Sequence, residues 1–165
     1  MTEAQARASP LVLATVVAGL VAAVVEMVFV LPIQALVLHN SPEAVFQSIA
    51  MGATGRAAFV GGWASAVQGM AWHTLVSLTA AAVYGLGAMH WPVLLRRPVI
   101  CGLGFGVAVY VFMIFGVIPL SKIGFTMPAA NVLTLVSFAI HLFAFGLPIA
   151  LVMRAIMSRP DRPRA

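Results

Sequence analysis

The sequence predicts an all-α integral membrane protein: a four-helix transmembrane bundle with a short interfacial helix between spans one and two. Three observations predict this class. Apolar residues make up 62% of the chain and charged residues 8%, which leaves too little polar surface for a water-soluble domain of 165 residues. The apolar residues fall into long runs of membrane-spanning length. The basic residues gather at the ends of those runs, as topology signals do.

The first predicted span covers residues 11–38. Ser9 and Pro10 are typical of an N-cap and a first helical position, so we expect the helix to begin there. Leu11–Leu31 corresponds to about 31 Å of helix, close to the hydrocarbon thickness of a bilayer. We expect Pro32 to kink or end the helix near the far interface. The apolar run is too long for a signal peptide, which favours a retained span.

The segment 39–55 predicts a short helix that lies in the membrane interface. Asn40 or Ser41 is a suitable N-cap, and Glu43 would lie near the positive end of the helix. The expected apolar side consists of Val45, Phe46 and Ile49, and the expected polar side of Gln47 and Ser48. The two glycines at the end of the segment predict where this helix stops.

The other three spans are predicted at residues 64–89, 99–118 and 131–153. Prolines mark their boundaries. Pro92 follows the second span and Pro128 precedes the fourth. Pro98 and Pro119 flank the third. The transmembrane domain at 11–154 is thus flanked by an N-terminal tail at 1–10 and a basic tail at 155–165.

The positions of the basic residues predict the orientation in the membrane. With four spans, the two termini and the loop at 90–98 share one face. The arginines expected on that face are Arg7, Arg96, Arg97, Arg154, Arg159, Arg162 and Arg164. Because the opposite face carries only Arg56 and Lys122, both termini are expected in the cytoplasm. The basic residues form no stripe with interleaved aromatic residues, so no nucleic-acid partner is expected.

Each predicted span carries a stripe of small and polar residues at helical spacing, which is the expected packing face of a helix in lipid. The stripes are Thr15, Gly19, Ala22 and Glu26; Gly69, His73, Ser77 and Tyr84; Gly102, Gly106, Tyr110 and Met113; and Thr134, Ser137, His141 and Pro148. Four stripes that agree predict the interior of one bundle.

Three ionisable side chains are expected to meet in that interior. Counted along each helix from the outer span ends, Glu26, His73 and His141 lie roughly 14–18 Å deep, with Tyr110 near the same level. An ionisable group at mid-membrane costs roughly 2.5–3.5 kcal/mol on insertion scales, so Glu26 should face inward toward a partner. These residues therefore predict a polar cluster, which would serve as a structural clasp, as a proton or ion relay, or as both.

The same residues leave a metal or haem site open as an alternative, although no cofactor is the first expectation. Two imidazoles and a carboxylate from His73, His141 and Glu26 suit iron or zinc. The two histidines at similar depth would also suit ligation of haem b. Cys101 is a single cysteine and predicts neither a disulfide nor a cysteine-based metal motif.

The sequence shows no nucleophile–base triad, no phosphate-binding loop and no nucleotide fingerprint, so we expect a non-enzymatic protein. Its expected partners are the lipid bilayer and further membrane protein, either as a homo-oligomer or as a larger complex. Neither the substrate nor the oligomeric state follows from these residues.

Three segments resemble an uncharacterised family of small bacterial inner-membrane proteins. They are VFQSIAMGATGRAAFVGGWASAVQGMAWH at 45–73, RRPVICGLGFGVAVYVFMIFGVIPLS at 96–121 and HLFAFGLPIALVMR at 141–154. The family is distantly similar to YagU-like proteins of unknown function. The resemblance implies a bacterial inner membrane and supports the four-span architecture, and it implies no active site.

Overall fold

The structure, a computed structural model, describes residues 3–124 and 129–158, with side chains from Pro10 onward. The described chain is helical and contains no strand, which confirms the predicted all-α class. Its long elements are α1 (Glu3–Val37), α3 (Gly62–His90), the series α5 (Pro98–Phe112), η2 (Met113–Val117) and α6 (Ile118–Leu120), and the series α7 (Val132–Ile140), η3 (His141–Gly146) and α8 (Leu147–Met157). The short elements are α2 (Pro42–Thr54), η1 (Gly55–Val60) and α4 (Val93–Arg96).

Three helical segments of the described chain are long and apolar enough to cross a membrane: Pro10–Val37, Pro98–Leu120 and Val132–Met157. Helix α3 has 29 residues, which at 1.5 Å per residue is also long enough. Helix α3 is not one of these three segments, because polar residues such as Gln68 and His73 lower its mean hydropathy.

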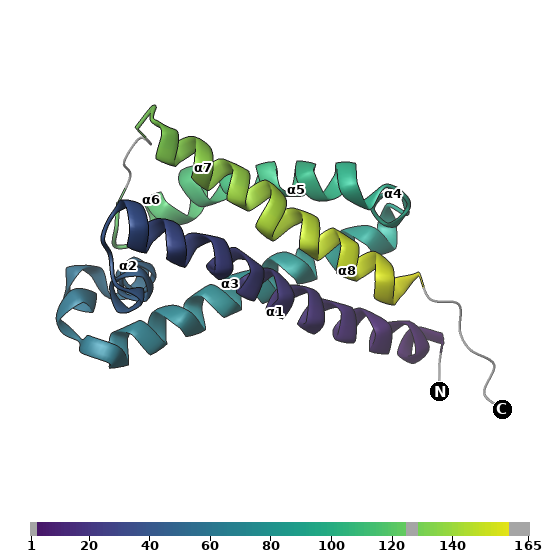
Figure 1. Cartoon of the computed structure of the whole chain (residues 1–165). Helices are drawn as coiled ribbons and strands as arrows, with labels where there is room; N and C mark the ends of the chain where they lie inside the picture. The colour runs from purple at the N-terminus through teal and green to yellow at the C-terminus, as the bar shows by residue number, and fades with distance from the viewer. Residues whose placement is uncertain (1–2, 125–128, 159–165) are drawn as a thin grey trace.

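We call the four long elements rods: α1 is the first, α3 the second, the series α5, η2 and α6 the third, and the series α7, η3 and α8 the fourth. The rods lie side by side and are joined mainly through α1 and α8 (Figure 1). Helix α1 packs against α3 and α8, and α5 packs against η3 and α8. The start of α1, the helix α4 and the end of α8 lie at one end of the bundle, which we call the terminal end (Figure 1). Helices α2 and α6 lie at the opposite end, which we call the α2 end.

The basic side chains that the structure describes lie on the predicted ends of the rods. Arg96, Arg97 and Arg154 come from the terminal end, where α4 ends, α5 begins and α8 ends. Arg56 and Lys122 come from the α2 end, where the Lys122 amide donates to the Gly52 carbonyl at 2.9 Å. The side chains of Arg7 and Ser9 lie outside the described part, as do the residues Arg159, Arg162, Arg164 and Pro128.

Helix α1 corrects the prediction about where it begins. It begins at Glu3 and not at Pro10, so the Ser9–Pro10 start is wrong. The residues before Pro10 are mostly Ala, Glu, Gln and Arg, which are strong helix formers and extend the helix toward the N-terminus. Of the two outcomes expected at Pro32, a kink or an end, the end is excluded, because the helix continues to Val37, close to the predicted end of the span at residue 38.

Helix α2 confirms its predicted cap but not its predicted polar side. The Ser41 hydroxyl accepts from the Ala44 amide at 3.2 Å, and the helix stops at Gly55, whose φ of 72° favours glycine. Gln47, expected on the polar side, is buried, and its Nε2 donates to Gly62 O at 3.1 Å. Burial follows because α2 packs onto the start of α3, where a Cβ on Gly69 would overlap the Phe46 carbonyl.

Three glycines allow the fourth rod to approach α5 closely. A Cβ on Gly106 would lie 2.5 Å from the His141 carbonyl oxygen, and a Cβ on Gly102 would lie 2.8 Å from the Ala150 Cβ. From the other side, a Cβ on Gly146 would overlap the Gly102 carbonyl. The predicted close-approach pair Gly102 and Gly106 thus makes backbone contact with the rod that carries His141.

The terminal half of the bundle holds a tightly packed set of side chains that we call the apolar core. Its members are Ala14, Ala18, Ala22, Ala81, Tyr84, Phe145, Ile149, Ala150 and Met153. The one hydroxyl in the set, on Tyr84, donates to Leu94 O at 2.9 Å. The apolar core extends along the same face of α1 that carries Glu26, because Ala14, Ala18 and Ala22 precede Glu26 at intervals of four residues.

Candidate functional site

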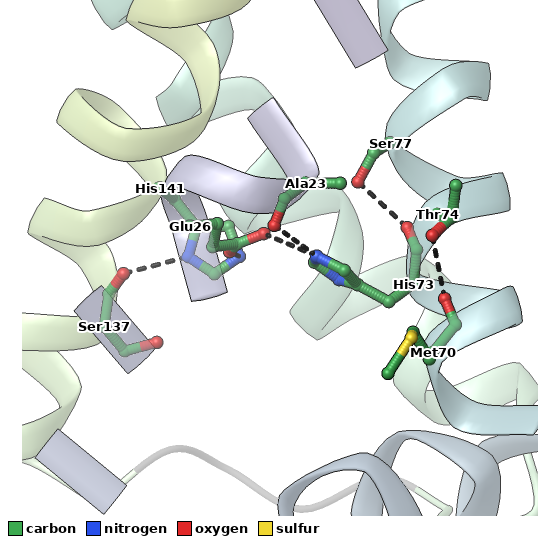
Figure 2. Close-up of polar contacts among 8 residues, drawn as sticks. All are labelled: Ala23, Glu26, Met70, His73, Thr74, Ser77, Ser137 and His141. Carbon is green, nitrogen blue, oxygen red and sulfur yellow. Dashed lines mark hydrogen bonds and ion pairs between the residues drawn. The ribbon is translucent and has the colours of Figure 1, made fainter. Parts of the chain in front are cut away.

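Glu26, His73 and His141 converge inside the bundle, and we call these three side chains the polar cluster (Figure 2). Glu26 comes from α1, His73 from α3 and His141 from the first position of η3. The Glu26 Oε1 lies 3.6 Å from His141 Nε2, and its Oε2 lies 3.9 Å from His73 Nε2. The carboxylate therefore lies between two imidazoles that belong to different rods.

The polar cluster is shielded from the surroundings of the bundle. The side chain of Glu26 is 9% exposed, that of His73 12% and that of His141 20%. Within the described side chains, these two histidines are the groups that form an ion-pair contact with Glu26. The described lysine and arginines belong to the ends of the rods, so neutralisation of the carboxylate falls to the imidazoles and to protons.

The hydrogen bonds of the two imidazoles determine which ring nitrogens carry hydrogen. His141 Nδ1 lies 2.9 Å from the Ser137 carbonyl, and His73 Nε2 lies 3.1 Å from the Ala23 carbonyl. A carbonyl oxygen only accepts, so both of these nitrogens donate. When His141 is neutral, its Nε2 consequently presents a lone pair to Glu26, and a proton between the two groups would join them.

The local fold of the fourth rod sets the position of His141. The rod changes at His141 from an α-helix to a π-helical segment that runs to Gly146. Such segments are rare and often lie at functional sites, because the extra residue per turn redirects one side chain. Here the close approach of Gly106 to the His141 backbone lets the imidazole reach the carboxylate across the bundle.

Tyr110, the fourth predicted member, packs against the polar cluster without bonding to it. Its ring lies edge-on to the His141 imidazole, with centroids 5.2 Å apart and planes at 75°. It packs in the same way against Phe138, at 5.1 Å. In the described part of the chain no hydrogen bond joins the Tyr110 hydroxyl to Glu26 or to either histidine. Tyr110 therefore contacts the polar cluster through the ring of His141.

The geometry does not favour the metal and haem alternatives. Among the described residues, no group of three His, Cys, Asp or Glu side chains is arranged to hold a metal ion. Ligation of one haem iron requires open space between His73 Nε2 and His141 Nε2, and the Glu26 carboxylate occupies that space. The three side chains are thus arranged as a carboxylate held between two imidazoles.

Two further contributors to the site were not predicted from the sequence. The Ala23 carbonyl holds His73, and no side-chain pattern reveals a backbone acceptor. Gln34 lines a small pocket that leads to His141. Its signal was present, because Gln34 lies eight residues after Glu26 and an amide in an apolar span is itself unusual.

Comparisons with known proteins add no relative. A scan against protein-family models finds no match, and searches of curated proteins and of solved structures find none.

Proposed function

We propose that the chain is a small four-span integral membrane protein whose bundle holds a proton-binding site formed by Glu26, His73 and His141. Three apolar rods support membrane insertion. The proposed fourth span is α3, which runs beside α1 and is about 43 Å long at 1.5 Å per residue. A short polar stretch at His73 is acceptable in such a span because it faces the bundle interior.

We also propose a bacterial inner membrane with both termini in the cytoplasm. The distribution of basic residues supports this orientation, since the arginines of the terminal end outnumber the basic residues of the α2 end. The resemblance of residues 45–73, 96–121 and 141–154 to small bacterial inner-membrane proteins distantly similar to YagU-like proteins supports both the location and membership of that family.

The observation that carries the proposed activity is the position of the Glu26 carboxylate between two imidazole Nε2 atoms. A charged carboxylate in a dry interior is costly unless it is neutralised. The neutralising species at Glu26 is a proton, held on the carboxylate itself or on an adjacent imidazole. Histidine exchanges protons near neutral pH. The polar cluster therefore binds and releases a proton between α1, α3 and η3, which makes it both a clasp and a proton-handling site.

Infrared difference spectroscopy during acidification tests this proposal in the reconstituted protein. We expect a carbonyl band of a protonated carboxylic acid that Glu26→Gln abolishes. The matched control is Glu43→Gln, which removes the glutamate of the first turn of α2 and should leave the band in place. A band that persists in Glu26→Gln, or no band in folded wild-type protein at any pH, would contradict proton binding at Glu26 and leave a structural clasp.

A further inference from the structure

We infer that the polar cluster exchanges protons with the α2 end alone, through a water-holding pocket between α1 and α7. This inference rests on the proposed proton-binding site and assigns it a direction. Three observations carry it: a pocket on one side of the cluster, polar groups along that pocket, and a packed apolar seal on the other side.

The pocket lies between the last third of α1 and the fourth rod. It has a volume of about 130 Å³, and its lining includes Val30, Gln34 and Leu38 from one side and Ser137 and His141 from the other. Since one water molecule in the liquid occupies about 30 Å³, the pocket has room for about four waters. It therefore extends from Leu38, beyond the end of α1, to an imidazole of the polar cluster.

Polar groups line this route, and a water chain requires such groups as hydrogen-bond partners. At the α2 end, the exposed Asn40 donates from Nδ2 to Gln34 Oε1 at 2.9 Å, so the Gln34 amide sits between solvent and the pocket. Deeper in the pocket lies Ser137, whose carbonyl accepts from His141 Nδ1. His141 Nε2 then faces Glu26 Oε1. Each step from Asn40 to Glu26 thus offers a donor or an acceptor.

The terminal side of the polar cluster is closed. One turn before Glu26 on α1, toward the terminal end, Ala22 is fully buried. Ala18 and Ala14, which precede it on the same face, are fully buried as well. Ile149 and Met153 of α8 fill the same layer and are also fully buried. Protein packed at this density excludes water, and these apolar side chains offer no partner for a water chain. Ser77, a buried polar residue on this side, is already engaged, because its hydroxyl donates to His73 O at 2.9 Å.

Among the described side chains, few groups face the carboxylate. His73 of α3 and His141 of η3 contact Glu26, and Tyr110 of α5 contacts His141. Glu43 of α2 is engaged by Gln47 at 3.2 Å.

His73 borders a second pocket, of about 510 Å³ between α1 and α3, whose lining is mainly apolar and includes Leu31 and Phe46. That pocket offers a water chain fewer polar partners than the pocket at His141. A proton that enters through the pocket between α1 and α7 meets His141 before it reaches Glu26.

Cysteine accessibility tests the route without titrating Glu26. In a Cys101→Ala background, we compare Val30→Cys with Phe29→Cys. Val30 lines the pocket, whereas its neighbour Phe29 is 52% exposed on the outside of the bundle. A charged, membrane-impermeant methanethiosulfonate should modify Val30→Cys about tenfold faster than Phe29→Cys from the α2 end, because the reactive thiolate forms in water and not in lipid. Lys122→Cys and Arg97→Cys report which end faces the reagent.

Reaction of Val30→Cys from the terminal end, or equal rates at positions 29 and 30, overturns the pocket as a one-sided route. Sealed vesicles of uniform orientation supply the second measurement. Acidifying the medium at the α2 end should produce the Glu26 infrared band, and acidifying the terminal end alone should not. A band produced equally from both ends overturns the direction, whereas a band absent even in detergent overturns proton binding itself, so the two failures are distinguishable.

Discussion

The two halves of the bundle are built from the same four rods but are held together by different means. In the terminal half, alanines of α1 pack directly against Ile149 and Met153 of α8, and the interior is apolar. In the half toward the α2 end, the same face of α1 presents Glu26, and the interior holds two imidazoles and a pocket whose lining includes the polar residues Gln34 and Ser137. Small side chains hold helices by close contact, whereas a polar side chain needs a partner from another rod.

This difference teaches that one stripe of a helix supports two kinds of interior. The spacing of four residues from Ala14 to Ala22 continues to Glu26 without a break. What changes at Glu26 is the part of the fourth rod that faces α1. The alanines of α1 face α8, whereas Glu26 faces the π-helical segment η3, which directs His141 inward. A carboxylate at position 26 of α1 is therefore stabilised by two imidazoles. A carboxylate one or two turns nearer the terminal end would lie among buried apolar side chains.

The largest expected effect comes from moving an acid into the terminal half. Ala18→Glu puts a carboxylate where the surrounding side chains are apolar and fully buried. We expect the free energy of unfolding to fall by about 3 kcal/mol more than in Ala18→Met, because Met adds similar bulk without charge. Unfolding in mixed micelles with increasing sodium dodecyl sulfate measures both. Equal losses would mean that the two halves do not differ in their tolerance of charge.

An intermediate effect is expected from separating α5 and the fourth rod. Gly146→Ala forces a Cβ against the Gly102 carbonyl and the Gly106 backbone, and we expect a loss of about 2 kcal/mol in the free energy of unfolding. Gly104→Ala is the matched control on the open side of α5, where a Cβ would meet nothing within 4 Å. It should leave the same denaturation curve unchanged or slightly stabilised, since alanine favours helix. A Gly146→Ala protein as stable as the control would refute close contact of the rods.

The smallest expected effect comes from loosening the polar half. His73→Ala removes the bond to the Ala23 carbonyl and the contact with Glu26, and we expect a loss of about 1 kcal/mol, as for other polar contacts between membrane helices. His90→Ala is the control on the same helix, because His90 is exposed and contacts the Leu86 carbonyl one turn away. It should change stability little.

A double-mutant cycle sharpens this comparison. If Glu26 and His73 act together, the loss in Glu26→Gln combined with His73→Ala is smaller than the sum of the single losses. Additive losses would show that the two side chains are energetically independent.

Much of the fold was predictable because the relevant signals are local. Ser41 caps α2 as predicted, since a hydroxyl at that position satisfies a free amide in the first turn. The failures lie where distant segments meet. Gln47 was expected on the polar side of α2, and its burial depends on α3, which begins 15 residues later along the chain. The start of α1 failed for a different reason, because good helix formers before Pro10 outweighed the proline signal.

The sequence by itself determined the helical class, the apolar rods and the common level of Glu26, His73 and His141 along the bundle, since that level follows from counting 1.5 Å per residue along each helix. The tertiary structure alone decided which imidazole nitrogens face the carboxylate, that Tyr110 packs beside His141 without bonding, and that a pocket opens toward one end. Those features depend on how far apart the rods lie and how each is rotated. Backbone contacts such as Gly106 against His141 set both, between residues far apart in the chain.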